Sequence, residues 1–183
     1  MKVAVLFADG FEEVEAVTPV DFLRRAEIDV TVTGINGGPV RGGHGIPITV
    51  DKTIGDVLQA AGEYDGVVVP GGMPGAEHVA ASKEAGEFIT KLAEWGKLVA
   101  AICASPAVVL QPLGILKGKK VTCYPGFEEK LEGAQFKAKR VVVDGNCITS
   151  RGPGTAAEFA VAIIQYLKGK EAAKSIHDAA LLK

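Results

Sequence analysis

Short apolar segments recur along the chain and alternate with longer segments in which apolar residues have a helical spacing. The apolar segments are rich in β-branched residues and contain few polar ones, which is typical of strands in a sheet covered by helices on both faces. Strands are predicted at Val3–Phe7, Val30–Thr33, Gly66–Val69, Leu98–Ile102, Val121–Cys123, Val141–Val143 and Cys147–Thr149. Helices are predicted at about Glu12–Ala26, Lys83–Trp95, Pro106–Leu110, Thr155–Leu167 and Lys170–Ala180.

This alternation predicts an α/β fold of the flavodoxin-like type, with a doubly wound and mostly parallel sheet. The glycine-rich segment Pro39–Val50 contains two prolines and is predicted to be an antiparallel ribbon inserted between two parallel strands. We see no linker, repeat or low-complexity segment, so residues 1–183 are expected to form a single domain. Ligands of such sheets bind beyond the carboxyl ends of the strands, where functional residues are therefore expected.

Composition narrows the classes of function. The net charge is −2 and charged residues make up 23%, so neither a nucleic-acid nor a membrane partner is indicated. No apolar run approaches the ~20 residues that span a membrane, and a cytoplasmic location is expected. The cysteines, Cys103, Cys123 and Cys147, are widely spaced, which argues against disulfides and a metal site. Cys123 and Cys147 fall in predicted strands and are expected to be buried and inert.

Cys103 directly follows the predicted strand Leu98–Ile102 and precedes a helix start. Ser105 is the expected N-cap and Pro106 the first helical residue. Such a strand–turn–helix junction is a nucleophile elbow, here with sulfur in place of a hydroxyl. We expect the nearby helix N-terminus to favour the thiolate and lower the thiol pKa. The alternative interpretation is a small buried hydrophobic residue.

Glu15 lies at an unusual point of the first predicted helix. Pro19, four residues later, cannot donate a hydrogen bond to the carbonyl of Glu15. The helix is therefore expected to kink or to restart with Thr18 as its cap. A carboxyl that is partly buried there would have a raised pKa and, when protonated, could donate a hydrogen bond to a thiolate.

The turn Pro70-Gly71-Gly72-Met73-Pro74-Gly75 lacks the G-x-G-x-x-G spacing of a dinucleotide-binding loop, so no nucleotide cofactor is expected. The amides of Gly71 and Gly72, with that of Ala104, could instead hold an oxyanion beside Cys103. The alternative is a plain tight turn. The three histidines, His44, His78 and His177, do not directly follow strands of the main sheet, which disfavours a Cys-His hydrolase.

Four motifs together resemble the ThiJ/PfpI superfamily, in the branch of the parkinsonism-associated protein DJ-one. They occur in the same order over essentially the whole chain: Gly10-Phe11-Glu12-Glu13-Val14-Glu15, Pro70-Gly71-Gly72, Ala101-Ile102-Cys103-Ala104-Ser105-Pro106 and Ser150-Arg151-Gly152-Pro153-Gly154-Thr155. The resemblance implies a fold related to class I glutamine amidotransferases, no cofactor and a homodimer. By position, the resemblance implies that Cys103 is the nucleophile and Glu15 the glutamate that hydrogen-bonds to it. It likewise implies that Gly71, Gly72 and Ala104 form an oxyanion pocket and that Pro153 forms a wall of the pocket.

The sequence departs from the family pattern at three positions. Tyr124 stands where several members have a histidine near the cysteine, and a neutral phenol is a poor base near pH 7. Ser105 replaces a glycine of many members, which is expected to affect only helix capping. His44 falls near the place where relatives have a basic residue of the dimer partner.

The resemblance implies two functions. In the first, Cys103 attacks a small reactive carbonyl such as methylglyoxal and Glu15 moves a proton, giving lactate without glutathione; deglycation of early adducts is a related activity. In the second, an oxidant converts Cys103 to a sulfinic acid, and the protein is a redox sensor or chaperone. An amidotransferase or a peptidase is disfavoured because a histidine partner is missing.

Overall fold

A seven-stranded sheet forms the centre of the computed structural model, which describes residues 1–182. Neighbouring strands are parallel except at the β10–β11 edge. This confirms the predicted α/β fold with a mostly parallel sheet. The strands in spatial order are β10 (Val141–Asp144), β11 (Cys147–Ser150), β7 (Leu98–Ile102), β6 (Gly66–Val69), β1 (Lys2–Phe7), β2 (Asp29–Gly34) and β5 (Lys52–Thr53).

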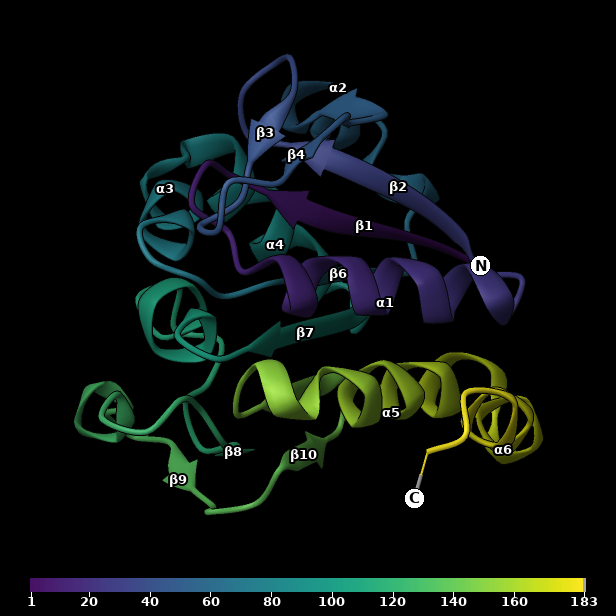
Figure 1. Cartoon of the computed structure of the whole chain (residues 1–183). Helices are drawn as coiled ribbons and strands as arrows, with labels where there is room; N and C mark the ends of the chain where they lie inside the picture. The colour runs from purple at the N-terminus through teal and green to yellow at the C-terminus, as the bar shows by residue number, and fades with distance from the viewer. Residues whose placement is uncertain (183) are drawn as a thin grey trace.

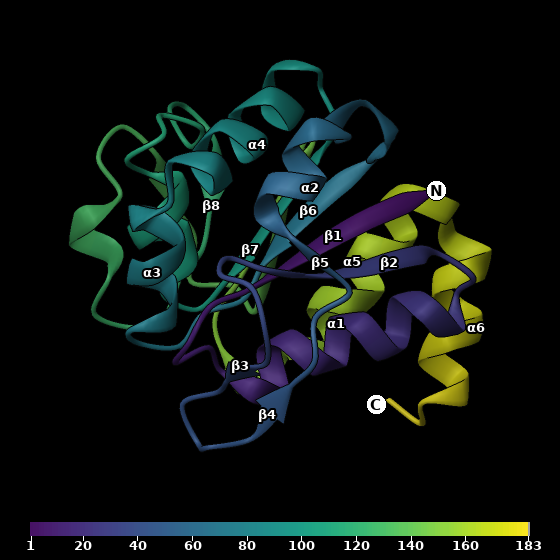
Figure 2. The same cartoon turned by 90° about the horizontal axis from the view of Figure 1, so that it is seen from above.

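Helices cover both faces of the sheet (Figure 1 and Figure 2). One face carries α1 (Glu13–Arg25), α5 (Ala156–Lys168) and α6 (Lys170–Ala179). The other carries α2 (Ile54–Gln59), α3 (Gly75–Ala81) and α4 (Lys83–Glu94), with the π-helical turn η2 (Pro106–Leu110). Strand β1 shows why both layers form: Val3, Val5 and Phe7 pack on the first face, while Ala4 and Leu6 pack on the second.

Several smaller elements differ from the expectations. The predicted ribbon is confirmed as β3 (Val40–Arg41) paired antiparallel with β4 (Pro47–Ile48). The predicted strand Val121–Cys123 is wrong as a member of the main sheet, because β8 (Lys120–Val121) pairs with β9 (Gln135–Phe136) in a separate sheet. Helices α2 and α3 were not predicted, since both are short. The remaining turns are η1 (Ala61–Glu63), η3 (Glu128–Lys130) and η4 (Pro153–Thr155).

Helix α1 runs unbroken from Glu13 to Arg25 with Pro19 inside it, so the expected restart at Thr18 is wrong. Ala16, Pro19 and Leu23 are buried on this helix. Packing of an apolar helix face supplies most of the stability of a helix in a protein, and here it outweighs the hydrogen bond that proline removes. Within residues 1–182, no helix is both long and apolar enough to span a bilayer.

Candidate active site

The backbone at Cys103 adopts a left-handed conformation, with φ of 65°. Its N–H donates to the carbonyl of Ser150 at 3.0 Å, and its carbonyl accepts from the N–H of Tyr124 at 2.8 Å. The helical turn begins directly afterwards, because the carbonyl of Ala104 accepts from the N–H of Ala107 and Val108. A non-glycine residue held in this region is strained, and such strain marks nucleophile elbows. The local geometry is therefore the one that the sequence predicted.

Ser105 is not the N-cap that the sequence predicted. Its own backbone is helical, with φ of −63° and ψ of −32°, so its side chain cannot reach the first free amides. The buried hydroxyl instead donates to the carbonyl of Pro70 at 2.5 Å. This bond ties the cysteine turn to the end of β6 and fixes the neighbouring glycine turn beside the thiol.

Glu15 reaches the same place from α1 and is fully buried. Its Oε2 accepts the N–H of Gly71 at 2.9 Å, whereas its Oε1 has no hydrogen-bond partner among the described residues. A Cβ atom on Gly71 would lie 2.5 Å from Cys103 Cβ and 2.6 Å from Glu15 Oε2. The carboxyl and the thiol can therefore meet only because residue 71 has no side chain.

The pKa values of both groups are raised. Burial raises the pKa of Glu15 to about 7, although the thiol of Cys103 and the amide of Gly71 act in the opposite direction. This confirms the expected direction for Glu15. Burial and the negative charge of Glu15 raise the pKa of the Cys103 thiol to about 12, against the opposing amides of Gly72 and Ala104. The expected lowering of the thiol pKa is wrong, because desolvation and a neighbouring carboxylate outweigh the amides.

With a pKa of about 7, the Glu15 carboxyl is ionised in about half of the molecules at pH 7 and in most of them at pH 8, whereas the Cys103 thiol stays protonated. Ionising both groups would place two negative charges side by side in a buried site. The predicted arrangement, a protonated glutamate facing a thiolate, is reversed to a carboxylate facing a thiol. A carboxylate in this position can accept the thiol proton when the sulfur attacks an electrophile.

The three amides expected to form an oxyanion pocket are divided between two tasks. Those of Gly72 and Ala104 point to the sulfur of Cys103, whereas that of Gly71 holds the carboxyl of Glu15. Gly72 has a φ of 87°, and a Cβ there would lie 2.3 Å from the backbone nitrogen of Glu12. Its backbone thus needs glycine both for conformation and for space.

Tyr124 and the turn after β11 lie beside this pair. A Cβ on Gly152 would be 3.1 Å from Cδ2 of Tyr124 and 3.8 Å from Oε1 of Glu15. The unpartnered oxygen of Glu15 therefore faces the space between Gly152 and the half-exposed Tyr124 ring. Pro153 is exposed at the start of η4. Gly152 is therefore the residue of this turn that lies beside Tyr124 and Glu15, and in the sequence only the Arg-Gly-Pro-Gly motif marks it.

His44 and the other two cysteines lie outside this arrangement. The Nδ1 atom of His44 is 2.9 Å from Oε2 of Glu13, and this hydrogen bond raises the pKa of the exposed histidine. Glu12 completes a cluster with them, and its Oε2 lies 3.7 Å from the same Nδ1 atom of His44. Cys123 and Cys147 are free and buried as expected, and burial raises the pKa of each to about 11.

We expect Glu15→Gln to stabilise the fold at pH 8 but not at pH 4. The pKa of Glu15 rises from 4.5 to about 7 on folding, a difference that corresponds to about 3 kcal/mol. Stability from this group is fully present below pH 4.5 and is lost as the pH rises through about 7. A neutral amide avoids that loss and can still accept from Gly71 N–H. Urea unfolding at both pH values measures the difference; equal effects at the two pH values would contradict the raised pKa.

We expect Gly71→Ala to separate the thiol from the carboxyl. The added methyl group overlaps both side chains, and a displacement of ~1 Å at reacting groups lowers a rate by about 100-fold. Overpacking should also destabilise the fold by ~1–3 kcal/mol. The matched control is Gly62→Ala, where nothing lies within 4 Å of the added atom. Lactate formation from methylglyoxal measures the change, and an unaltered rate in Gly71→Ala would show that the close approach is unimportant.

Comparison with known proteins agrees with this fold. The sequence profile of the DJ-1/PfpI family matches residues 1–166, and the chain belongs to this family. It is 40% identical to the Parkinson disease protein 7 homolog of Danio rerio, over all of this chain and 97% of that protein. The DJ-1 homolog B of Arabidopsis thaliana is 42% identical over 99% of this chain and 41% of its own length. The chain thus spans less than half of the two Arabidopsis relatives.

Two further matches bear on chemistry. The chain is similar to a protein of Pyrococcus abyssi that is named a deglycase, with 36% identity over 84% of this chain and 92% of that protein. Among solved structures it is similar to DJ-1 of Toxoplasma gondii in an oxidized form. That match has a TM-score of 0.95 and 41% identity and covers 98% of this chain and 97% of the other.

Proposed function

We propose that this protein converts small dicarbonyl compounds such as methylglyoxal to hydroxy acids such as lactate, using Cys103 as nucleophile and Glu15 as acid and base. The observation that carries the proposal is the buried carboxyl of Glu15, which is held against the thiol and has one oxygen without a partner. A buried carboxyl oxygen without a hydrogen-bond partner costs free energy of folding, and groups of this kind are concentrated at functional sites. The deglycase name of the Pyrococcus relative supports carbonyl chemistry of this kind.

In the first step, Glu15 accepts the thiol proton as the sulfur of Cys103 bonds to the aldehyde carbon. The product is a hemithioacetal, and its oxygen lies near the amides of Gly72 and Ala104, which stabilise the negative charge that develops there. Burial of the site strengthens these hydrogen bonds.

Glu15 then gives the thiol proton to the alkoxide oxygen and is again a carboxylate. In the second step, this carboxylate removes the proton from the former aldehyde carbon and returns it to the neighbouring carbon, while the hydroxyl proton passes to the neighbouring oxygen. The hemithioacetal thereby becomes a thioester, so that one carbon is oxidised and its neighbour is reduced. Water then hydrolyses the thioester, and lactate and the free thiol of Cys103 are released. No cofactor enters this balance.

The test is lactate formation from methylglyoxal by the purified protein, without glutathione. Stoichiometric conversion with retained activity over many turnovers is the expected result. Loss of methylglyoxal without lactate would show that the protein only binds the aldehyde, and the proposal would fail. A glycated peptide offered in parallel tests the related deglycase activity.

A second candidate function is redox sensing, favoured by the oxidized form of the Toxoplasma relative. Here Cys103 gains two oxygens and becomes a sulfinic acid next to Glu15 and the glycine amides. We expect an intact-mass increase of two oxygens in mild peroxide that is absent in Cys103→Ser. Equal oxidation of Cys123 and Cys147 would contradict a specific sensor.

The remaining properties are proposals of the same kind. One sheet with its covering helices supports a single domain over residues 1–183. We propose a homodimer, a cytoplasmic location, a small carbonyl compound or an oxidant as partner, and no cofactor or metal. Pro153 is proposed as a wall of the pocket, with Tyr124 as a hydrogen-bond donor to substrate.

A further inference from the structure

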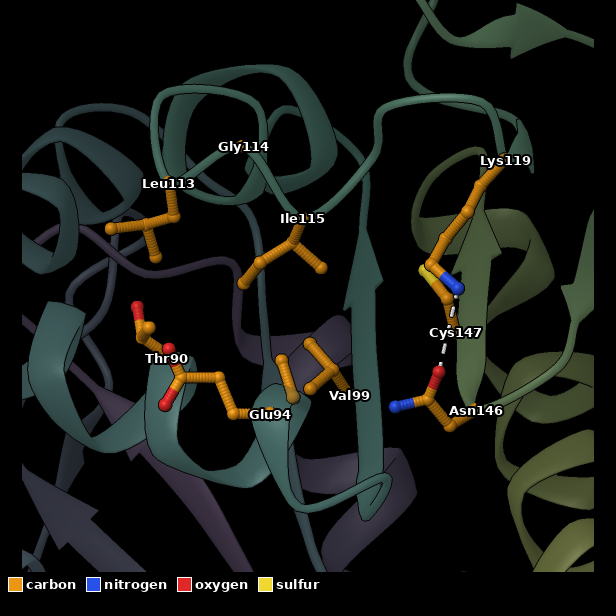
Figure 3. Close-up of a pocket in the computed structure, with 10 residues that line it drawn as sticks. Thr90, Glu94, Val99, Leu113, Gly114, Ile115, Lys119, Asn146 and Cys147 are labelled. Carbon is orange, nitrogen blue, oxygen red and sulfur yellow. Dashed lines mark hydrogen bonds between the residues drawn. The ribbon is translucent and has the colours of Figure 1, made fainter.

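A cavity of about 300 Å³ lies at the other end of the sheet from Cys103 (Figure 3). It opens beside Val99, near the start of β7, whereas Cys103 follows the last residue of that strand. Val99, Leu113 and Ile115 form an apolar lining. The volume is at the lower end of the range for small-molecule sites.

Lys119 places a cation in this cavity. Its Nζ lies 3.4 Å from Oδ1 of Asn146, and no carboxylate oxygen within residues 1–182 lies within 4 Å of it. Asn146 is itself fixed. Its side-chain Nδ2 donates to the backbone carbonyl of Lys97 at 2.8 Å, and its backbone carbonyl accepts from Val99 N–H at 2.9 Å. Lys119 is half-buried, and its ammonium group has one long hydrogen bond and no carboxylate partner among the described residues, so it can pair with an added anion.

The other polar groups of the cavity define what that anion can be. Glu94 lies across the cavity from Lys119 and is turned toward Thr90 (Figure 3), so a second negative charge on a ligand would be repelled. Cys147 also lines the cavity, and burial raises its pKa to about 11. At neutral pH it is therefore an uncharged thiol and does not compete for Lys119.

We propose that this cavity binds a small organic monocarboxylate with a compact apolar body. The carboxylate pairs with Lys119, and the body packs against the partly exposed Leu113 and Ile115 above the buried Val99. The chemistry at Cys103 plays no part in this binding, so this proposal can be tested independently of the proposed enzymatic function.

The first test compares two probes of the same shape, benzoate and its neutral isostere benzamide. In an NMR titration of the full chain, benzoate should shift the amide signals of Val99, Ile115 and Cys147 with an affinity of about millimolar. Benzamide should bind at least about fivefold more weakly, because only benzoate pairs with the lysine. Equal binding of the two probes, or benzoate shifts confined to the surroundings of Cys103, would overturn the proposal.

The second test removes the cation. Lys119→Met keeps the length of the side chain and should weaken benzoate binding by about tenfold, with no change for benzamide. Lys119→Arg should retain benzoate binding, which separates loss of charge from damage to the fold. The matched control is Lys120→Met, at an exposed neighbour outside the cavity. Unchanged benzoate binding in Lys119→Met would refute the assignment.

Discussion

Cys103→Ser is expected to lower lactate formation from methylglyoxal by at least ~1,000-fold. The hydroxyl is a far weaker nucleophile than a thiol, and the Glu15 carboxylate, with a pKa of about 7, is too weak a base to compensate. The change removes little else, because the strained backbone at Cys103 is held by hydrogen bonds to Ser150 and Tyr124 that serine retains. The measurement is lactate by enzymatic assay, without glutathione.

Cys147→Ala is the matched control for this experiment. It also removes a thiol, but one that lies near the start of β11, far along the sheet from the elbow. Its turnover should equal that of the wild type. Comparable activity in Cys103→Ser and the wild type would exclude Cys103 as the nucleophile and with it the proposed function. Lactate lost equally in both variants would point to a general structural effect of removing cysteine.

The sequence was sufficient to place the cysteine because the signals there are local. An apolar strand runs directly into Cys103, and a proline follows three residues later, so strand, turn and helix are compressed into one stretch of chain. The same holds for the parallel sheet, whose strands are individually apolar. Local patterns of this kind predict the structure correctly because local preference and tertiary packing favour the same conformation.

The errors arose where distant segments meet. Ser105 has the local signature of an N-cap, but it donates to Pro70, 35 residues away. The adjacent helix alone predicts a lowered thiol pKa, but burial raises it, together with the carboxyl of Glu15, which comes from α1. Glu15 itself was identified from Pro19, yet what fixes it is the amide of Gly71, 56 positions along the chain. Contacts of this separation leave no local pattern.

Glu15→Gln is expected to lower turnover by about 100- to 10,000-fold, the range for loss of a general acid–base. Glutamine fills the same volume and can still accept from Gly71, but it can neither take the thiol proton nor move a proton between carbons. The loss should appear in kcat rather than KM, since the substrate bonds to sulfur and not to this carboxyl. Because the same substitution should stabilise the protein at pH 8, inactivity there cannot result from unfolding.

The pH dependence separates a carboxylate base from a protonated acid at Glu15. The base must be ionised, so kcat/KM of the wild type should rise with pH through about 7. One pH unit below that midpoint, kcat/KM should be about a tenth of its value on the high-pH plateau. Residual activity of Glu15→Gln should lack this step and follow the thiol alone, rising only at high pH, because burial keeps the pKa of Cys103 raised. A wild-type profile that instead falls as the pH rises through 7 would mean that the protonated carboxyl is the active form, and the thiolate would then be the resting nucleophile. Measurement of both profiles between pH 5 and 9 decides whether Glu15 or Cys103 holds the proton when the reaction begins.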